Sequence, residues 1–340
     1  MSPIAPALAM LAAELAELTG RLGGRVDVAA LQVTDRAGQL PLKAPGLVSP
    51  NRACRLVRAA DGWIAVNLAR EDDRDLVAAW LRCGFGAEPW AAIAALAPAR
   101  TREDLLGDAA LLGLPVAAVG EVVAEGLEAS RLPLGRGAPA KGKPKVVDLS
   151  ALWAGPLCGA ILAEMGASVA KVESVTRPDP TRTSTPEFFR RLNGGKADVR
   201  LDLSAPGGRA RLAAMISEAD VLITSVRPRG LASLGLSVDG LFAANPSLVW
   251  VAVTGYGWTG EAAQRVAFGD DAAAAGGLVG WSPDGAPRFL GDALADPVTG
   301  LAAAAGALKG LAGGGGVLVD AALARCAAGA ARVCNIAAAA

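Results

Sequence analysis

The stretch VVDLSALWAGPLCGAILAEMGASVAKVE, residues 146–173, decides the fold class. A strand-like segment runs from Lys145 to Leu149, a Gly/Pro turn leads into a helix near Ala154–Met165, and a second strand-like segment follows at Ser168–Glu173. This order is typical of a βαβ unit, whose two strands are parallel. Further strand-like segments follow at Ala219–Thr224 and Leu248–Thr254. The sequence therefore predicts an α/β fold with a Rossmann-like, mostly parallel sheet flanked by helices.

The residues before this stretch have a different pattern. An amphipathic helix is predicted over residues 5–22, a strand over Gly62–Asn67, and helices begin near Asp72 and Thr101. Residues 129–145 are rich in Pro, Gly and basic side chains, which is typical of a linker. We predict a smaller α+β domain over residues 1–135, a linker over 136–145, the large domain over 146–325 and an Ala-rich tail over 326–340.

Composition excludes several functional classes. The 33 basic and 33 acidic residues cancel, so no net field favours nucleic acid or an anionic membrane. The chain has no histidine, which excludes His-based zinc sites, Ser-His-Asp triads and Cys-His dyads. Glu14 and Glu17 interrupt the apolar N-terminus, and five scattered cysteines form no C-x-x-C pair. We expect a cytoplasmic protein with reduced thiols, no bound metal, and no nucleic-acid or membrane partner.

A ligand of a parallel sheet lies at the carboxyl ends of the strands, where connecting loops gather. Here these loops are Ser150–Gly159, Ser225–Gly230 and Thr254–Gly260. A dinucleotide site is one alternative, because a strand, a turn and a helix are followed by Glu173 at the end of the next strand. The spacing G-x-G-x-x-G is missing, however, and this disfavours a nicotinamide cofactor.

Several short motifs in a fixed order carry a family resemblance. After residues 146–173 come LNGGK at 192–196, LDL at 201–203, ADVLI at 219–223, NPSLV at 245–249, TGYG at 254–257 and GDALADPVTGL at 291–301. The chain resembles the class III CoA-transferases, a family that includes formyl-CoA and carnitine CoA-transferases and 2-methylacyl-CoA racemases. The resemblance implies an acyl-CoA and a carboxylate acceptor as substrates, with no cofactor beyond coenzyme A itself.

By this resemblance Asp296 occupies the position of the transferases' nucleophilic aspartate. A carboxylate with a reference pKa of about 3.9 is ionised at neutral pH and can attack a thioester without a general base. The reaction would pass through an aspartyl mixed anhydride and an aspartyl-CoA thioester. Backbone N–H groups in Gly255–Gly257 and Gly276-Gly277 are candidate donors to the oxyanion. The alternative for Asp296 is an N-cap of a helix over Pro297–Leu311.

A racemase is the second hypothesis. Moving a proton from the carbon beside the thioester needs two acid/base groups, and family racemases pair the aspartate with a histidine. Here the corresponding stretch contains Phe268, Asp270 and Asp271 instead, so these two aspartates are the next catalytic candidates. Both could equally cap the Ala-rich helix that follows. A third hypothesis is a CoA-binding protein without catalytic activity.

The resemblance also implies where coenzyme A would bind. Its phosphates favour Arg, Lys and helix N-termini. Trp153 and Ser174 stand where the transferases often have a polar residue and an arginine, so contacts there are in doubt. The expected CoA-binding residues follow the first strand or lie within the motifs: Leu152, Trp153, Ala154, Gly155, Pro156, Arg182, Asn193, Lys196, Ser225, Arg227, Gly255 and Tyr256.

The order of the two domains differs from that of the family. Features of the family's small domain, ADGWI at 60–64 and GLPVAAV at 113–119, precede the large domain here although they normally follow it. The arrangement therefore resembles a permutation. Family members form interlocked dimers, so we expect a homodimer whose interlocking the permutation could alter.

Overall fold

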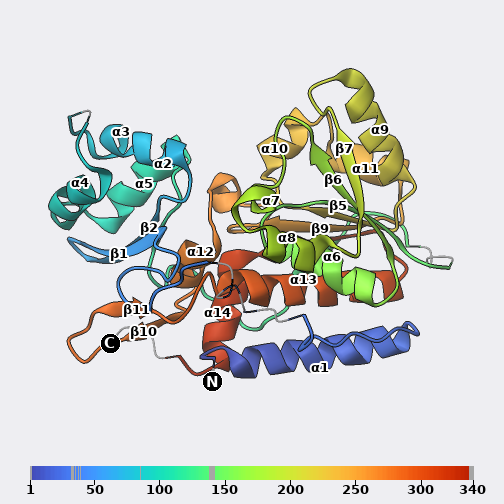
Figure 1. Ribbon diagram of the computed structural model, residues 1–340, viewed down its shortest axis with the longest axis horizontal. Coiled ribbons are helices and arrows are strands. Elements are labelled where there is room, and N and C mark those ends of the chain that lie inside the picture. Colours follow the sequence, from blue (N-terminus) through green and yellow to red (C-terminus); the bar gives the residue numbers. More distant parts are fainter. Residues whose placement is uncertain are drawn as a thin grey trace.

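The computed structural model describes residues 2–31, 34, 36, 38, 40–84, 86–137 and 142–336 (Figure 1). Its main element is a seven-stranded sheet with the order β4-β12-β9-β8-β5-β6-β7. All neighbouring strands are parallel except β4, which pairs antiparallel with β12 at one edge. The strands are β4 (Ser130–Pro133), β5 (Lys145–Leu149), β6 (Ser168–Ser174), β7 (Ala197–Leu201), β8 (Val221–Thr224), β9 (Val249–Thr254) and β12 (Val317–Ala322).

The six parallel strands have the doubly wound order of a dinucleotide-binding fold, with β5 at the centre. The chain moves outward through β6 and β7, then returns to the other side of β5 at β8. Val147 shows the consequence, since it pairs with Ala170 of β6 on one side and Leu222 of β8 on the other. The predicted α/β fold is confirmed. Its topological switch point lies between β5 and β8.

Helices cover both faces of this sheet because its strands are apolar on both faces. Val146 and Ile223 belong to one hydrophobic cluster, whereas their neighbours Val147 and Leu222 belong to another. The helices on the face of Val147 are α9 (Pro206–Ser217), α10 (Pro228–Ser233) and α11 (Val238–Ala244). The opposite face is covered by α6 (Ala154–Glu164), α8 (Pro186–Asn193), α13 (Ala295–Ala312) and α14 (Leu323–Val333), as Figure 1 shows, and α7 (Thr181–Ser184) precedes α8.

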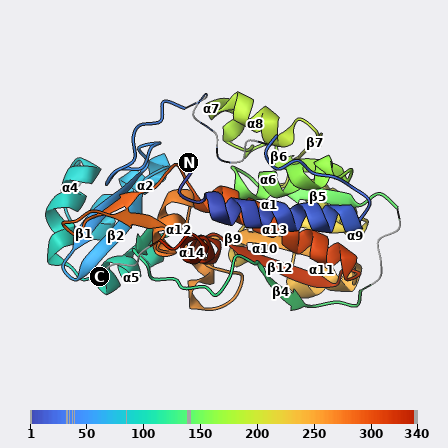
Figure 2. The same cartoon turned by 90° about the horizontal axis from the view of Figure 1, so that it is seen from below.

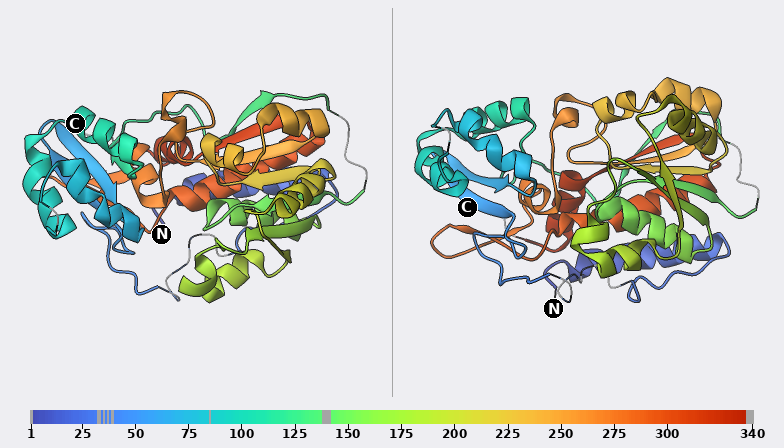
Figure 3. Two further views of the ribbon diagram at one scale, coloured as in Figure 1. Left: turned by 90° about the horizontal axis from the view of Figure 1, so that it is seen from above. Right: turned by 45° about the horizontal axis from the view of Figure 1, so that its top comes forward.

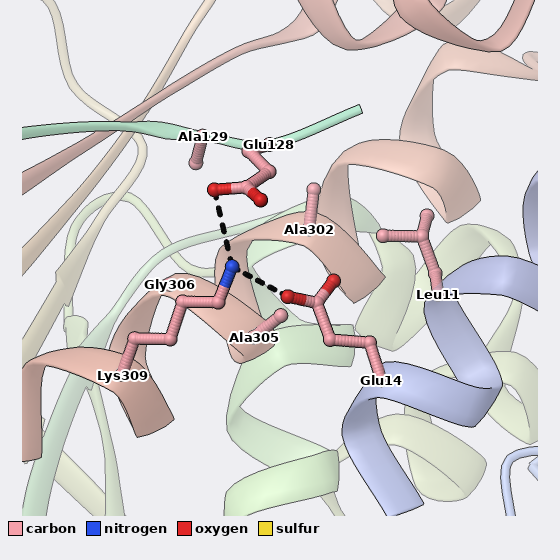
Figure 4. A pocket seen from close by; sticks show the side chains of 8 residues that line it. All are labelled: Leu11, Glu14, Glu128, Ala129, Ala302, Ala305, Gly306 and Lys309. Carbon is pink, nitrogen blue, oxygen red and sulfur yellow. Dashed lines mark ion pairs between the residues drawn. The ribbon is translucent and has the colours of Figure 1, made fainter. Parts of the chain in front are cut away.

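The N-terminal helix α1 (Ala5–Arg21) packs along α13 rather than within a separate domain (Figure 2). Leu11 and Leu15 are buried there, because the apolar side of an amphipathic helix lies against the Ala- and Gly-rich surface of α13. At the edge of this contact, Lys309 of α13 forms ion pairs with Glu14 of α1 and with Glu128 (Figure 4). Since β4 also joins the large sheet, the packing does not follow the domain boundary predicted at residue 135.

The smaller unit is built on a three-stranded antiparallel sheet of β1 (Cys54–Ala59), β2 (Gly62–Asn67) and β3 (Val116–Ala118). One face packs on four helices around the buried Trp80 and Ile93, and the two units lie side by side in Figure 3. The other face contacts α12 (Gly269–Ala275). The helices are α2 (Glu71–Asp75), α3 (Val77–Leu81), α4 (Pro89–Leu96) and α5 (Arg102–Leu112). The strands β10 (Val279–Trp281) and β11 (Pro287–Phe289) form a separate two-stranded antiparallel hairpin.

The predicted Ala-rich tail is wrong for the residues that the structure describes. Residues 323–333 form α14, whose Ala327 and Ala330 are fully buried in the same core as α13. Small side chains allow helices to pack closely, so this composition serves the core here. Of the predicted linker, residues 138–141 lie outside the described residues, and Lys145 already begins β5. No helix among the described residues has both the length and the apolar character needed to cross a membrane.

Candidate active site

Asp296 lies in the first turn of α13, at the carboxyl edge of the sheet. Its backbone N–H donates to the Ala293 carbonyl (3.0 Å), and the N-cap position is held by Leu294. The interpretation of Asp296 as an N-cap is therefore wrong, because the helix starts one residue before it. The backbone amide of Ala154, the first residue of α6, faces the Asp296 carboxylate and lowers its pKa. The positive end of α6 thus faces this carboxylate.

The half-buried carboxyl group of Asp296 holds its proton unusually tightly. Burial raises its pKa to about 7, since few water molecules can solvate the charge. Arg36 opposes this rise, whereas the charges of Asp270 and Asp292 add to it. The sequence-based expectation of an ionised Asp296 used the pKa of an exposed carboxylate, and burial raises the pKa above that reference value.

Two further carboxylates and one guanidinium surround Asp296. Asp270 accepts hydrogen bonds from the Ala293 backbone amide (2.8 Å) and from Asn51 Nδ2 (2.7 Å), and Asn51 Nδ2 also lies 2.9 Å from Asp292 Oδ1. Arg36 donates to both oxygens of Asp292, at 2.7 and 2.8 Å. Burial and the charge of Asp292 raise the pKa of Asp270 to about 6. We call Asp270, Asp292 and Asp296 the aspartate cluster.

Asp271 points away from this cluster, although it adjoins Asp270 in sequence. It accepts from the backbone amide of Phe268 (3.0 Å) at the start of α12 and from Asn67 of β2 (2.8 Å). Complete burial raises its pKa well above the ordinary value. The capping interpretation therefore holds for Asp271, which fastens α12 to the small sheet.

The turn between β5 and α6 is shaped around the aspartate cluster. Leu152 has a left-handed backbone (φ 70°), and its amide donates to Asp179 (3.1 Å). Trp153 is buried at the N-cap of α6, where the Arg36 guanidinium lies 4.5 Å from its ring centre. A Cβ on Gly155 would lie 2.3 Å from the Cβ of Ser150, so only glycine fits there. This turn brings the Ala154 amide to Asp296.

Lys196 is an internal residue. Its ammonium group donates to Asp148 (2.7 Å), to the Pro156 carbonyl (2.7 Å) and to Asn193 Oδ1 (2.9 Å), and its side chain is fully buried. Burial raises the pKa of Asp148, but Lys196 and Lys171 outweigh it and hold this pKa below the ordinary value. All three N–H donors of Lys196 have partners inside the protein. This geometry fastens the start of α6 and leaves no N–H for a CoA phosphate.

The other predicted CoA-binding residues are spread along the same edge. Arg182 pairs with Glu173 (2.8 Å), Ser225 accepts from the Ala151 amide (2.9 Å), and Tyr256 contacts Glu121 (3.2 Å). Gly255 is packed so that a Cβ would lie 2.9 Å from that of Ala267. These contacts hold neighbouring loops together, whereas Ala154 is the predicted CoA-binding residue whose amide lowers the pKa of Asp296.

Most glycine amides expected to hold an oxyanion have partners elsewhere. Gly257 N–H donates to the Thr254 hydroxyl (2.9 Å), while those of Gly276 and Gly277 donate to carbonyls of α12 at 3.0 Å. The Ala154 amide is the donor that the structure places at Asp296. Two strained residues flank it, because Ala293 (φ 45°), like Leu152, has a left-handed backbone. Such strain in non-glycine residues concentrates at functional sites.

Arg227 lies in a cluster of like charges, which we call the arginine cluster. Its pKa is lowered by burial and by the guanidinium groups of Arg229, Arg70 and Arg177. A Cβ on Gly113 would lie about 4 Å from Arg227 and Arg229, and Arg70 donates to the Gly113 carbonyl (3.1 Å). The guanidinium groups of the arginine cluster therefore lie beside Gly113, at the end of α5 of the smaller unit. Such repulsion is relieved when an anion binds.

The sequence analysis missed Arg36, Asn51 and Asp292 in the site and Arg70 in the arginine cluster. Asp292 lies within the quoted motif GDALADPVTGL, four residues before Asp296, so that motif held a signal for it. Arg36 and Asn51 precede Asp292 by 256 and 241 residues, and no local pattern connects them. Only the fold could place them here.

Comparison with known proteins identifies a family and several relatives. Residues 143–336 match the family described as CoA-transferase family III. A succinyl-CoA–D-citramalate CoA-transferase of Chloroflexus aurantiacus is 33% identical over 176 residues, which cover 49% of this chain and 44% of that protein. A succinate–glutarate CoA-transferase of Agrobacterium fabrum is 34% identical over 172 residues, which cover 46% and 43%. The chain thus matches less than half the length of these two relatives.

A solved structure extends the likeness to the fold. The crystal structure of a CAIB/BAIF family protein from Brucella suis is 33% identical in sequence, with a TM-score of 0.52 over 58% of this chain and 56% of that one. The family match over residues 143–336 contains the six parallel strands of the sheet, the first turn of α6 and Asp296. The chain therefore belongs to CoA-transferase family III.

Proposed function

We propose that this protein transfers coenzyme A from an acyl-CoA to a carboxylate acceptor, with Asp296 as the nucleophile. The observation that carries the proposal is the contact between the Asp296 carboxylate and the Ala154 amide at the N-terminus of α6. An ionised carboxylate held at a positive helix end can react without a histidine. The relatives named as CoA-transferases support the same reaction class.

The first half of the reaction exchanges a thioester for an anhydride. Asp296 attacks the thioester carbonyl, the C–S bond breaks, and an acyl-aspartyl anhydride and CoA thiolate form. The thiolate then attacks the aspartyl carbonyl, which releases the donor's carboxylate and leaves CoA attached to Asp296 as a thioester. In every step the charge of the attacking anion moves onto the carbonyl oxygen of a tetrahedral intermediate, so a backbone N–H beside the reacting carbon lowers the barrier.

The second half reverses this order on the acceptor. An acceptor carboxylate attacks the aspartyl-CoA thioester and expels CoA thiolate, which gives a new mixed anhydride. The thiolate attacks the acceptor's carbonyl carbon, and Asp296 leaves as a carboxylate. Atoms and charges balance, because one thioester and one carboxylate become another thioester and carboxylate. The chemistry uses no cofactor besides coenzyme A, which is a substrate.

The phosphates of coenzyme A are proposed to bind at the arginine cluster. Guanidinium groups recognise phosphate oxygens through paired N–H donors. Arg227 of the cluster was predicted from the sequence, and its recorded hydrogen bond goes to the Gln264 carbonyl rather than to a carboxylate. We expect Arg227→Gln to weaken binding of an acyl-CoA about tenfold or more. Arg211→Gln, on the exposed surface of α9, is the matched control and should leave binding unchanged.

Proton transfer at the acyl-CoA α-carbon, the racemase hypothesis, receives less support. It needs a second acid/base group beside Asp296. Asp270 is one of the two candidates that were predicted from the sequence. Its two oxygens, however, already accept hydrogen bonds from Asn51 and Ala293. Solvent deuterium entering the α-carbon of a recovered acyl-CoA would favour this reaction over CoA transfer.

The proposal is tested by intact-protein mass spectrometry after incubation with a panel of acyl-CoAs. A mass increase that hydroxylamine removes, mapped to the peptide that contains Asp296, is the expected result. Asp296→Asn should form no adduct, whereas Asp284→Asn, on the exposed β10–β11 turn, should behave as the unaltered protein. Binding of acyl-CoA without any adduct would overturn the covalent mechanism and favour a non-catalytic binding role.

The assembly and location of the protein stay predictions. A homodimer is expected from the family resemblance, and light scattering coupled to gel filtration measures it directly. The cytoplasmic location is a prediction from the sequence, and fractionation of cells that express the protein tests it.

A further inference from the structure

Asn51 is fixed in a single orientation by the turn that carries it. Its Oδ1 accepts hydrogen bonds from the Ala53 amide (2.9 Å) and the Ser49 hydroxyl (2.9 Å). The Arg52 amide closes the turn on the Ser49 carbonyl (2.9 Å), and Arg52 has a left-handed backbone (φ 71°). Because both acceptor contacts lie on one side, the NH₂ group must point to the other side.

That NH₂ group points into the aspartate cluster. It lies 2.7 Å from Asp270 Oδ2 and 2.9 Å from Asp292 Oδ1, so both of its N–H donors are engaged. An amide N–H stabilises the ionised form of the carboxylate that accepts it. Asn51 therefore favours the ionised form of Asp270. The turn around Asn51 holds the amide in this orientation.

Asp270 transmits this effect to Asp296 in two ways. Its Oδ1 accepts from the Ala293 amide (2.8 Å), and the Ala293 carbonyl accepts from the Asp296 amide (3.0 Å), so Asp270 supports the strained residue that starts α13. Its negative charge also makes Asp296 harder to ionise. A charged Asp270 thus favours the protonated form of Asp296.

The other charged groups near the cluster come from separate elements. Arg36 pairs with Asp292 and lies over Trp153, and the Ala154 amide faces Asp296 from α6. Asp271 of α12 and the buried thiol of Cys54 of β1 lie on the side of the small sheet; burial and the charges of the two α12 aspartates raise the pKa of that thiol. Neither Arg36 nor Asn51 lies within residues 143–336, the part matched by the family.

We propose that Asn51 is a positioning residue that keeps Asp270 ionised and thereby favours the protonated form of Asp296. By keeping Asp270 charged it leaves the proton on Asp296 below neutral pH and so sets the pH at which Asp296 becomes ionised. The consequence for CoA transfer rests on the proposed function, but the location of the proton does not. The N-terminal segment thereby controls the reactivity of a residue in the family-matched region.

The direct test is a pH titration of the protein with ¹³C in the aspartate side-chain carboxyls, followed by NMR. Signals of Asp296 and Asp270 are assigned from the Asp296→Asn and Asp270→Asn variants. In Asn51→Leu, Asp270 loses a donor and keeps its proton to higher pH, so the repulsion on Asp296 falls. We expect the Asp296 midpoint to move to lower pH by about half a unit or more. An unchanged midpoint in the folded variant overturns the proposal.

A double-mutant comparison separates this effect from general disturbance. Asp270→Asn alone should also lower the Asp296 midpoint, because it removes the neighbouring charge. Adding Asn51→Leu to Asp270→Asn should then change the midpoint little, since the route through Asp270 is gone. An equal further shift in that background would contradict the proposed route. If leucine prevents folding, Asn51→Ser, whose short side chain suits the turn but cannot reach Asp270, replaces it with the same expected shift.

Asn67 supplies a matched control. It is the second asparagine that donates to an α12 aspartate, at 2.8 Å from Asp271, but Asp271 faces away from the cluster, toward the Phe268 amide and the small sheet. Asn67→Leu should leave the Asp296 midpoint in place. The NMR midpoint reports on the proton, and adduct formation in the unaltered protein reports on the proposed function. A shifted midpoint without any adduct would therefore overturn the function and keep the role of Asn51.

Discussion

Gly269 lies so close to Asp296 that a Cβ added to it would fall 2.0 Å from Asp296 Oδ2. The same Cβ would lie 2.8 Å from the Ala293 carbonyl oxygen. Both the Asp296 side chain and the backbone at Ala293 would therefore have to move to make room for it. The start of α12 therefore forms one wall of the Asp296 position. Glycine is required at 269 because the carboxylate uses the space that a side chain would fill.

Gly269→Ala should accordingly displace the Asp296 carboxylate from the Ala154 amide. We expect adduct formation to slow by about tenfold to a hundredfold, since a misplacement of about 1 Å has this order of cost, and unfolding to become easier by about 1–3 kcal/mol. Gly207→Ala, in α9 with nothing within 4 Å of its Cβ, is the control. It should leave the rate unchanged and stabilise the helix by about 0.5–1 kcal/mol. Equal rates for both variants would contradict the tight contact.

The rate of adduct formation should depend on pH through Asp296. Its pKa is raised to about 7 by burial, and only the ionised form attacks a thioester. The rate should therefore fall about tenfold per pH unit below this value and level off above it. Single-turnover mass spectrometry between pH 5 and 9 measures this. A rate that stays constant down to pH 5 would mean that Asp296 is ionised throughout and that burial does not govern its reactivity.

Stability should depend on pH through the same group, with a definite sign. The pKa of Asp296 is higher in the folded protein than in the unfolded chain, so the folded state binds more protons between the two values. Its stabilising contribution is complete at low pH and is lost as pH rises through about 7. Asp296→Asn removes the buried charge and should raise the free energy of unfolding at pH 8 by about 1–3 kcal/mol, below the ceiling for a fully buried group.

Thermal unfolding of this variant at two pH values checks the sign. The gain in Tm should be clear at pH 8 and should shrink at pH 5, where Asp296 of the unaltered protein is already neutral in the folded state. A variant that is less stable than the unaltered protein at pH 8 would show that the carboxylate supports the fold instead of straining it.

The α/β fold class could be predicted from local sequence patterns, because the strands and helix of each βαβ unit follow one another along the chain. The stretch at 146–173 contains β5, α6 and β6 with their turn, and the position of Asp296 followed from a motif of the same kind. The limits of the smaller domain could not be predicted from the sequence. The amphipathic pattern of α1 shows that one side is buried, but it does not show that this side packs on α13. The environment of Asp296 was equally inaccessible, because Arg36 and Asn51 reach it only through the fold.

Lys196 shows the same limit at the level of one side chain. A lysine in a family motif near a strand end is equally consistent with a phosphate ligand and with a buried partner of a carboxylate. Asp148, which decides between them, lies 48 residues earlier, and in the sequence it is only the polar residue of an apolar strand. Because the pairing depends on how β5, α6 and the segment before β7 meet, it becomes visible only in three dimensions.

Lys196→Met should therefore act on stability rather than on CoA binding alone. Methionine fills a similar volume but leaves the buried Asp148 charge without its main partner, and breaking one side of a buried pair costs about 3–5 kcal/mol. We expect a large loss of Tm, or insoluble protein, and partial recovery in Lys196→Met combined with Asp148→Asn, where the uncompensated charge is gone. The fraction that remains folded should bind acyl-CoA with nearly unaltered affinity. Unchanged stability together with a tenfold loss of affinity would instead identify Lys196 as a phosphate ligand, which would require its ammonium group to leave Asp148 when coenzyme A binds.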